Sequence, residues 1–474
     1  MKKGEVMSRV ERDSLGEMEL SDDAYYGVQT ARAMVNFPVS GMRERLEFIQ
    51  AYVTIKKAAA LSNVELGMLD SERGDAIVQA ADDILNRDGE FTNVQEQFPV
   101  DVFQAGAGTS FNMNINEVLA NRALEILGRN RGDYEFLSPN DHVNMGQSTN
   151  DTFPSASHIA IFLYSGPLLE KLQDLAYALD AKSQEFSDIP KSGRTHLMDA
   201  TPLTLGNEFG AYAAAVYRST IRITERSDDL LELPLGGTAV GTGVNTHPDY
   251  RAKIIDTISK ITGYSFRPAI NSYEALQSRA QLNAFSGSLR ELAIELGRIA
   301  NDLRLMGSGP TTGISEITLP AVQPGSSIMP GKVNPVMAEC LNMICFHVIG
   351  NDTAVSLAAQ AGQFDLNVMT PVMIHNILES MTLLTNYLPV FTERCVRGIR
   401  ANVEKCRSNL ELNPSQATLL NPRIGYMEAA ELAKEASERE ISVMELAVEK
   451  KILTREEAEE LFDPICAARG KYDE

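Results

Sequence analysis

Residues 282–306 read LNAFSGSLRELAIELGRIANDLRLM, and this stretch decides the fold class. Its apolar residues recur with alternating gaps of three and four, which is the a/d pattern of a helix packed nearly parallel to its neighbours in a bundle. The positions of this seam are Leu282, Phe285, Leu289, Leu292, Leu296, Ile299, Leu303 and Met306. A helix of about 25 residues is roughly 37 Å long, which is more than a usual globular helix.

Three further segments, 156–186, 207–232 and 336–360, also have helical patterns. The sequence therefore predicts a mainly α protein built around a central bundle of very long helices; the alternative is an all-α enzyme with shorter helices. Strand patterns are weak, and the first 40 residues look irregular. Near the C-terminus, Ser442 and Thr454 are expected to begin two capped helices.

Changes in composition predict three domains. An N-terminal domain is expected over 1–145, a central long-helix bundle over 146–402, and a small helical domain over 403–474. The second boundary is placed where Asn402 and the Asn413-Pro414 pair interrupt the helical pattern.

The composition restricts the partners. The formal net charge of −21 argues against nucleic acid and against an anionic membrane surface, because both need a basic protein surface. An acidic protein that binds anions must create positive potential locally, through a lysine, a histidine or helix N-termini. Five cysteines without metal-ligand spacing, no apolar core in residues 1–13 and no membrane-length apolar run together predict a cytoplasmic protein.

Four short segments gather hydroxyl and amide side chains with glycine in an otherwise apolar chain. They are GAGTSFNMN (106–114), HVNMGQSTND (142–151), GRTHLMDATP (193–202) and GSSIMPGKVNPVMAE (325–339). Taken singly, each is most simply a helix cap. Four of them at the starts of long helices instead favour a carboxylate site. The glycine-rich stretch 235–246 fits no phosphate-binding pattern and is expected to be a loop that shapes a pocket.

In this order, the four segments resemble the aspartase/fumarase superfamily over nearly the whole chain. The resemblance implies a three-domain, mostly helical subunit and a homotetramer whose central helices form one bundle. It also implies active sites that are each built from segments of three subunits.

The implied reaction is an anti elimination from a succinate-like dicarboxylate, which needs no metal or cofactor. Ser326 would remove the proton beside one carboxylate, helped by backbone N–H groups of the 327–331 turn and by the charge of Lys332. The resemblance also implies roles for other residues. The first carboxylate would be surrounded by Thr109, Ser148, Thr149 and Ser327, and the other one would be held by Lys332, Asn334 and Thr195. The leaving group would be contacted by Asn150 and His196, and Glu339 would orient His196. The alternatives are a structural histidine at His196 and a flexible linker around Ser326.

The sequence contains features of two kinds of family member that differ in the leaving group. Thr149 and the stretch AGQFDLNVM (361–369) are typical of the members that eliminate ammonia from aspartate, whereas LGGTA (235–239) and NSYEAL (271–276) are typical of those that hydrate fumarate. We favour ammonia elimination and keep fumarate hydration as the alternative. Thr311 and Met198 replace a usual arginine and glutamine, which also leaves open an N-substituted aspartate or another 2-substituted succinate. A scaffold without activity is a further alternative.

Overall fold

The predicted seam is one continuous helix. The computed structural model describes residues 8–87 and 89–468, and in it α9 spans Ala280–Met306. All eight seam residues are buried, the most exposed being Met306 at 6%. Residues 1–7 lie outside the described residues. They belong to segment 1–13, for which the sequence predicts no apolar core.

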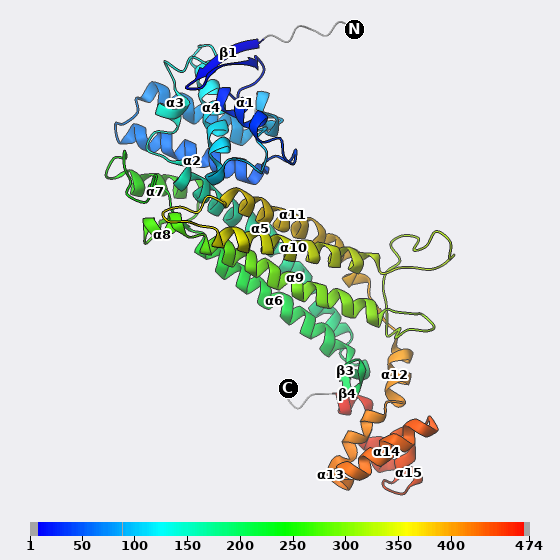
Figure 1. The fold of residues 1–474 in the computed structure, drawn as a ribbon. Coiled ribbons are helices and arrows are strands. Elements are labelled where there is room, and N and C mark those ends of the chain that lie inside the picture. The colour runs from blue at the N-terminus through cyan, green and yellow to red at the C-terminus, as the bar shows by residue number, and fades with distance from the viewer. Residues whose placement is uncertain (1–7, 88, 469–474) are drawn as a thin grey trace. The chain divides into compact units, whose positions relative to one another are not determined.

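Four other long helices accompany α9 (Figure 1). They are α5 (Thr149–Glu185), α6 (Leu205–Asp229), α10 (Val336–Gln360) and α11 (Thr370–Arg394). The first three confirm predicted segments, although α5 begins earlier than expected, and α11 was not predicted. Each of the five has at least 25 residues, so the alternative of shorter helices is wrong and the mainly α class is confirmed.

The contacts divide the chain into two units. The first unit groups the residues up to Leu168 with Arg222–Arg290 and His347–Leu383, and the second groups Leu169–Ile221, Glu291–Phe346 and the residues from Leu384 onwards. All five long helices contribute residues to both units. The predicted boundaries at 145 and 402 stay a prediction about domains.

The first unit combines short strands with helices. Here α2 packs against α3 and α7, and α3 packs against α4 (Figure 1). Hydrogen bonds from Ser286 and Arg290 to Asp352 join α9 to α10. Besides the long helices, its elements are β1 (Ser8–Asp13), β2 (Gly16–Ser21), α1 (Val28–Asn36), α2 (Leu46–Glu65), α3 (Ser71–Asn86), α4 (Thr109–Ile126), β5 (Glu232–Leu233), α7 (Tyr250–Thr262), β6 (Arg267–Pro268) and α8 (Ser272–Gln277).

The antiparallel pair β1 and β2 lies where the sequence looked irregular, so that expectation was wrong. Its strands are mostly exposed or half-buried. Strand β1 has one apolar residue, Val10, and the apolar alternation of β2 is limited to Met18 and Leu20. Arg9 stabilises the pair, because its Nη1 donates to the carbonyls of Ser21 and Ala24 and its Nη2 to that of Tyr26.

The second unit contains the hairpin β3–β4 and the C-terminal helices. A hydrophobic cluster that includes Leu420, Leu432 and Leu446 forms a core within residues 417–462. Ser442 and Thr454 cap α15 and α16 as predicted, and Thr454 forms a capping box with Glu457. Besides the long helices, the elements are β3 (Pro190–Thr195), β4 (Met198–Thr204), β7 (Ile317–Thr318), β8 (Arg400–Ala401), α12 (Val403–Glu411), α13 (Asn421–Ile424), α14 (Tyr426–Arg439), α15 (Val443–Glu449), α16 (Arg455–Leu461) and α17 (Pro464–Ala468).

A buried carboxyl precedes α2. Glu44 is 2% exposed, and its Oε1 accepts only a long hydrogen bond, 3.4 Å, from Gln104 Nε2. Burial and the nearby charge of Asp101 raise the pKa of Glu44 to about 8, and Arg45 offsets only part of this. The native state therefore holds a proton on Glu44 at pH values where the unfolded chain has released it.

We expect this proton to make the first unit less stable as pH rises. The folded pKa of Glu44 is raised, so the stabilising contribution is present at low pH and is lost between about pH 4.5 and 8, by up to about 1.4 kcal/mol per pH unit. Glu44→Gln should therefore melt progressively higher than the wild type as pH increases from 5 to 8. The exposed Glu72→Gln is the matched control, and a Glu44→Gln difference that is independent of pH would contradict the assignment.

Candidate active site

A cleft of about 700 Å³ opens in the first unit and gathers four of the predicted residues. Thr109, Ser148, Thr149 and Asn150 all line it. The other lining residues that the argument uses are Asn112, Asn144, Gln147, Thr238 and Ala239. The structure thus brings together side chains from two of the four polar segments.

The chain before α4 is shaped to present Thr109. Ala107 and Gly108 have φ values of 62° and 83°, in the left-handed region. A side chain at Gly108 would meet the Phe153 ring at 2.0 Å, so only glycine fits there. Thr109 is consequently the exposed first residue of α4, at the helix N-terminus.

Ser148 acts as the cap of α5. Its Oγ accepts the N–H of Asn150 at 3.2 Å, and its own N–H donates to Asp151 Oδ1 at 3.0 Å. The capping interpretation of this segment is therefore correct for Ser148, and it places Thr149 and Asn150 at the first turn of α5. Thr149 is buried in the cleft wall, and Asn150 is half-buried.

The glycine-rich stretch 235–246 forms the opposite wall of the cleft, which confirms the expected pocket-shaping loop. The buried Asp151 holds it, because Oδ2 accepts the N–H groups of Gly236 at 2.9 Å and Thr238 at 2.8 Å. Asn150 Nδ2 adds a hydrogen bond to the Ala239 carbonyl at 2.8 Å. One short segment at the start of α5 therefore fixes both sides of the cleft.

A fully buried lysine lies under the cleft. Lys56, on α2, is 0% exposed, and its Nζ donates to Asn144 Oδ1 at 2.9 Å and to Gln147 Oε1 at 2.8 Å. Burial lowers the pKa of Lys56 to about 7, an effect that the charge of Asp151 only partly offsets. Burial likewise raises the pKa of Asp151 to about 6 against its backbone hydrogen bonds and Lys56.

The cleft is suited to an anion. Two helix N-termini, at Thr109 and Thr149, end at it, and both their N–H groups and their dipoles favour a negative ligand. Four hydroxyl side chains, those of Thr109, Ser148, Thr149 and Thr238, line the same space, and a hydroxyl can rotate to donate. Lys56 supplies the only cationic side chain that the described residues place in contact with the lining amides.

Thr195 and His196 lie in the second unit, at the tip of the hairpin β3–β4. His196 and Leu197 have φ values of 56° and 60°, which form the tight two-residue turn that matches strand twist. Thr195 pairs with Met198 to close the turn. All four side chains are exposed.

The predicted loop around Ser326 joins β7 to α10 in the second unit. Ser326 Oγ accepts two backbone N–H groups, from Ile328 at 3.3 Å and from Met329 at 3.0 Å. Pro330 and Gly331 form the expected turn, closed by the Lys332 N–H on the Met329 carbonyl. This geometry is that of a compact turn.

Other predicted residues of the second unit have varied environments. Ser327 and Lys332 are exposed, and Asn334 Nδ2 closes the loop by donating to the Gly325 carbonyl. Glu339 lies in the first turn of α10. Among the described residues, no hydrogen bond joins Glu339 to His196, so the orienting role stays a prediction.

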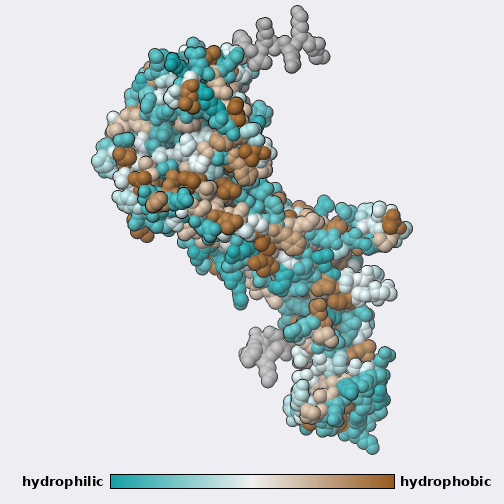
Figure 2. All heavy atoms as spheres, viewed as in Figure 1, coloured by the Kyte–Doolittle hydropathy of each residue, from teal (hydrophilic) through white to brown (hydrophobic). Residues whose placement is uncertain are grey.

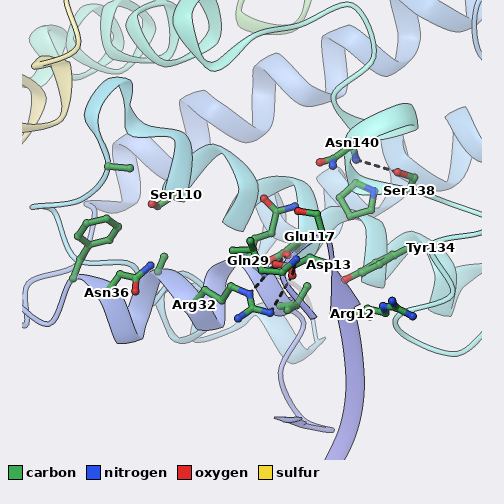
Figure 3. Close-up of a pocket in the computed structure, with 17 residues that line it drawn as sticks. Arg12, Asp13, Gln29, Arg32, Asn36, Ser110, Glu117, Tyr134, Ser138 and Asn140 are labelled. Atoms are coloured by element: carbon green, nitrogen blue, oxygen red, sulfur yellow. Dashed lines mark hydrogen bonds and ion pairs between the residues drawn. The ribbon is translucent and has the colours of Figure 1, made fainter. Parts of the chain in front are cut away.

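A second cavity of the first unit, about 660 Å³, holds none of the predicted site residues (Figure 3). Two of its charged groups pair with each other: Arg32 donates to both oxygens of Asp13, as the dashed lines show. Glu117 accepts N–H groups at the start of α1, and burial raises its pKa to about 7 despite them. We interpret this cavity as part of the packing of α1.

Sequence reasoning missed Lys56 and gave no role to Asp151. A sequence pattern for Lys56 existed: Phe48, Tyr52 and Lys56 are spaced by four on α2 and all are buried. A lysine on an apolar helix face is a sign of a functional or paired charge. In the part of the chain that the structure describes, no three or more His, Cys, Asp or Glu side chains are grouped to hold a metal ion, and no helix has the length and apolarity needed to cross a membrane.

Comparisons with known proteins agree with this geometry. The sequence matches the lyase family over residues 16–350 and the fumarase C C-terminus family over 417–465. An aspartate ammonia-lyase of Bacillus sp is 47% identical over 96% of both chains, and a class II fumarate hydratase of Halobacterium salinarum is 48% identical over 96% of both. The crystal structure of a fumarate lyase:delta crystallin from Brucella melitensis bound to cobalt is 47% identical, covers 98% of this chain and 100% of its own, and superimposes with a TM-score of 0.93. The chain therefore belongs to the aspartase/fumarase superfamily of lyases.

Proposed function

We propose that the protein eliminates ammonia from L-aspartate to give fumarate, as an aspartate ammonia-lyase. The observation that carries this proposal is the pair of N–H groups donated to Ser326 Oγ within the GSSIMPGKVNP loop. A serine hydroxyl is a poor base unless its alkoxide is stabilised. Two fixed donors that already point at the oxygen provide this stabilisation without reorganisation.

The proton leaves the carbon beside a carboxylate, which then carries a second negative charge. The barrier falls only if fixed donors and positive potential meet this enediolate. Thr109, Ser148 and Thr149 supply hydroxyls in the cleft of the first unit, and Lys56 adds a buried positive group behind it. Ser327 would complete this set from the loop.

The remaining roles follow the resemblance. Lys332 and Asn334 would hold the second carboxylate together with Thr195. His196 and Asn150 would face the leaving ammonia. In this assignment Asn334 first has to release the Gly325 carbonyl or bind with its oxygen, because its Nδ2 is used within the loop.

We also propose a homotetramer whose active sites combine segments of three subunits. The exposed hairpin tip, with Leu197 and Met198 at 75% and 70%, supports it. So does α10, which exposes Met343, Phe346 and Leu357 at 64%, 66% and 58%. Hydrophobic residues form part of the visible surface (Figure 2), and exposed apolar residues on a long helix are typical of an interface. The expected cytoplasmic location stays a prediction.

Hydration of fumarate is the second candidate. Relatives named fumarate hydratase support it. The one from Halobacterium salinarum is 48% identical to this chain, and the aspartate ammonia-lyase of Bacillus sp is 47% identical. Met198 and Thr311, both exposed, also leave room for a less polar or N-substituted substrate.

The purified protein distinguishes these candidates. We expect ultraviolet absorbance of fumarate to rise with L-aspartate and not with L-malate. A rise with L-malate alone would establish the second candidate. No change with either would contradict both and direct the search to N-substituted aspartates.

A further inference from the structure

Glu316 is a buried carboxylate that binds one arginine through both oxygens. It is 0% exposed, and it lies directly before β7. Arg194 Nη1 donates to its Oε2 at 2.9 Å, and Nη2 donates to its Oε1 at 2.6 Å. Such a bidentate pair fixes the orientation of the guanidinium as well as adding energy.

Lys191 and Asn409 complete the environment of this carboxylate. Lys191 Nζ lies 3.1 Å from Glu316 Oε2 and 2.8 Å from Glu208 Oε1, and Asn409 Nδ2 donates to Glu316 Oε1 at 3.2 Å. Burial alone raises the pKa of Glu316, but the hydrogen bonds of Arg194 and the charge of Lys191 outweigh it and hold the pKa below its usual value. The carboxyl is therefore ionised at neutral pH.

The backbone of Glu316 is also anchored. Its N–H donates to the carbonyl of Met306, at the end of α9, at 2.9 Å. Its carbonyl accepts the N–H of Asn402, which follows β8, at 2.8 Å. Glu316 is thus a fixed point that connects α9, β8 and β3 within the second unit.

The turn that follows Arg194 has no comparable support of its own. His196 and Leu197 both adopt left-handed backbone, which costs a non-glycine residue roughly 1 kcal/mol or more. Their side chains are exposed, so packing within the chain does not hold them. The fixed Arg194 pairs with Asp199 across the hairpin, next to the Thr195–Met198 pair that closes the turn.

We propose that Arg194 and Glu316 are positioning residues that fix the Thr195–His196 turn for the elimination reaction, an inference that rests on the proposed function. They act through the turn and do not touch the substrate. Replacing the Glu316 carboxylate with an amide leaves one acceptor oxygen and adds an NH2 donor. Arg194 can then no longer donate to two oxygens at once, so the guanidinium and the turn beside it are no longer held in one orientation. A displacement of about 1 Å at a reacting group can cost on the order of 100-fold in rate.

Glu316→Gln is the main variant. We expect kcat/KM to fall by at least about 10-fold, on whichever of L-aspartate and L-malate the wild type converts. We also expect faster backbone hydrogen–deuterium exchange in residues 193–199. Arg194→Lys keeps the positive charge but loses the two-nitrogen geometry of the guanidinium, so it should show the same changes in milder form. This variant replaces Glu316→Gln in the test if Glu316→Gln fails to fold.

Asp352→Asn is the matched control. Asp352 is also a buried carboxylate that accepts from an arginine, at 2.9 Å from Arg290 Nη1, and both of its hydrogen-bond partners, Ser286 and Arg290, lie on α9. It should leave kcat/KM and the exchange of 193–199 unchanged even if it lowers the melting temperature. Equal kinetic losses in Asp352→Asn and Glu316→Gln would overturn the positioning role.

A double-mutant cycle separates positioning from general stability. In a His196→Ala background, Glu316→Gln should cost less than about 3-fold, because the group that it positions is already gone. The same fold loss in both backgrounds would overturn the proposal. If the wild type converts neither substrate, the proposed function fails. The hydrogen–deuterium exchange of Glu316→Gln then tests the positioning role by itself: unchanged exchange in residues 193–199 refutes it, and faster exchange supports it.

Discussion

Ser326→Ala is expected to reduce turnover by roughly 1,000-fold and to leave the fold and the oligomeric state unchanged. Removing a positioned general base typically costs between about 100-fold and 10,000-fold. In this loop the hydroxyl receives two N–H groups and donates to no described residue, so its loss leaves the other hydrogen bonds of the loop in place. Turnover at saturating substrate measures the loss of activity, and sedimentation of the variant measures its oligomeric state.

Ser442, which only caps a helix, is the control for Ser326. Ser442 Oγ accepts the N–H of Glu445 at 3.1 Å at the start of α15. Ser442→Ala should cost about 1 kcal/mol of stability and no turnover. Near-normal turnover of Ser326→Ala would remove Ser326 as the base, whichever substrate the wild type uses.

Lys56→Met is expected to lower kcat/KM on the order of 100-fold. Gln147 Oε1 accepts a hydrogen bond only from Lys56 among the described residues, so the variant leaves this half-buried acceptor at the cleft without its donor. The variant also removes the buried amine behind the cleft, which in its protonated form would face the charge that the substrate carboxylate gains. Methionine keeps the length and the apolar stem of the side chain and removes the ammonium that lies 5.5 Å from the centre of the Tyr52 ring.

Lys57→Met is the neighbouring control. Lys57, also on α2, forms a partly exposed ion pair with Asp82 of α3 and lines no part of the cleft, so its loss should change kcat/KM by less than about 2-fold. Similar kinetic losses in both variants would mean that α2 as a whole, and not the ammonium of Lys56, is responsible.

Stability against pH gives a second test of Lys56. Its folded pKa, about 7, lies below that of an unfolded lysine, near 10.4, so the unfolded state binds more protons between these values. This group therefore makes the native state more stable as pH rises from about 7 to 10. The melting temperature of Lys56→Met should fall relative to the wild type over this range, whereas Lys57→Met should run parallel to it.

Local patterns in the sequence were sufficient for much of the architecture. The apolar periodicity of α9 and the caps at Ser442 and Thr454 depend on residues a few positions apart, and the structure confirms them. The Ser326 turn is equally local, since its donors are two and three residues further along.

The interactions that were missed join residues far apart in the chain. Lys56 meets Asn144 and Gln147, and Arg194 meets Glu316, in each case across roughly 90 residues or more. No pattern within a helix or a turn encodes such a pairing. The hairpin β1–β2 was missed for a different reason: β1 has a single apolar residue, the alternation of β2 is limited to Met18 and Leu20, and Arg9 supports the pair.

The loop that carries Ser326 is hydrogen-bonded to itself. Its two ends meet, because a side chain at Gly325 would lie 2.3 Å from the Lys332 carbonyl oxygen, and Asn334 ties the same two ends together. Both donors to Ser326 Oγ lie between these ends. The electrostatic environment of the hydroxyl is therefore carried by the loop as one piece, and any displacement of that piece would move the hydroxyl together with both of its donors.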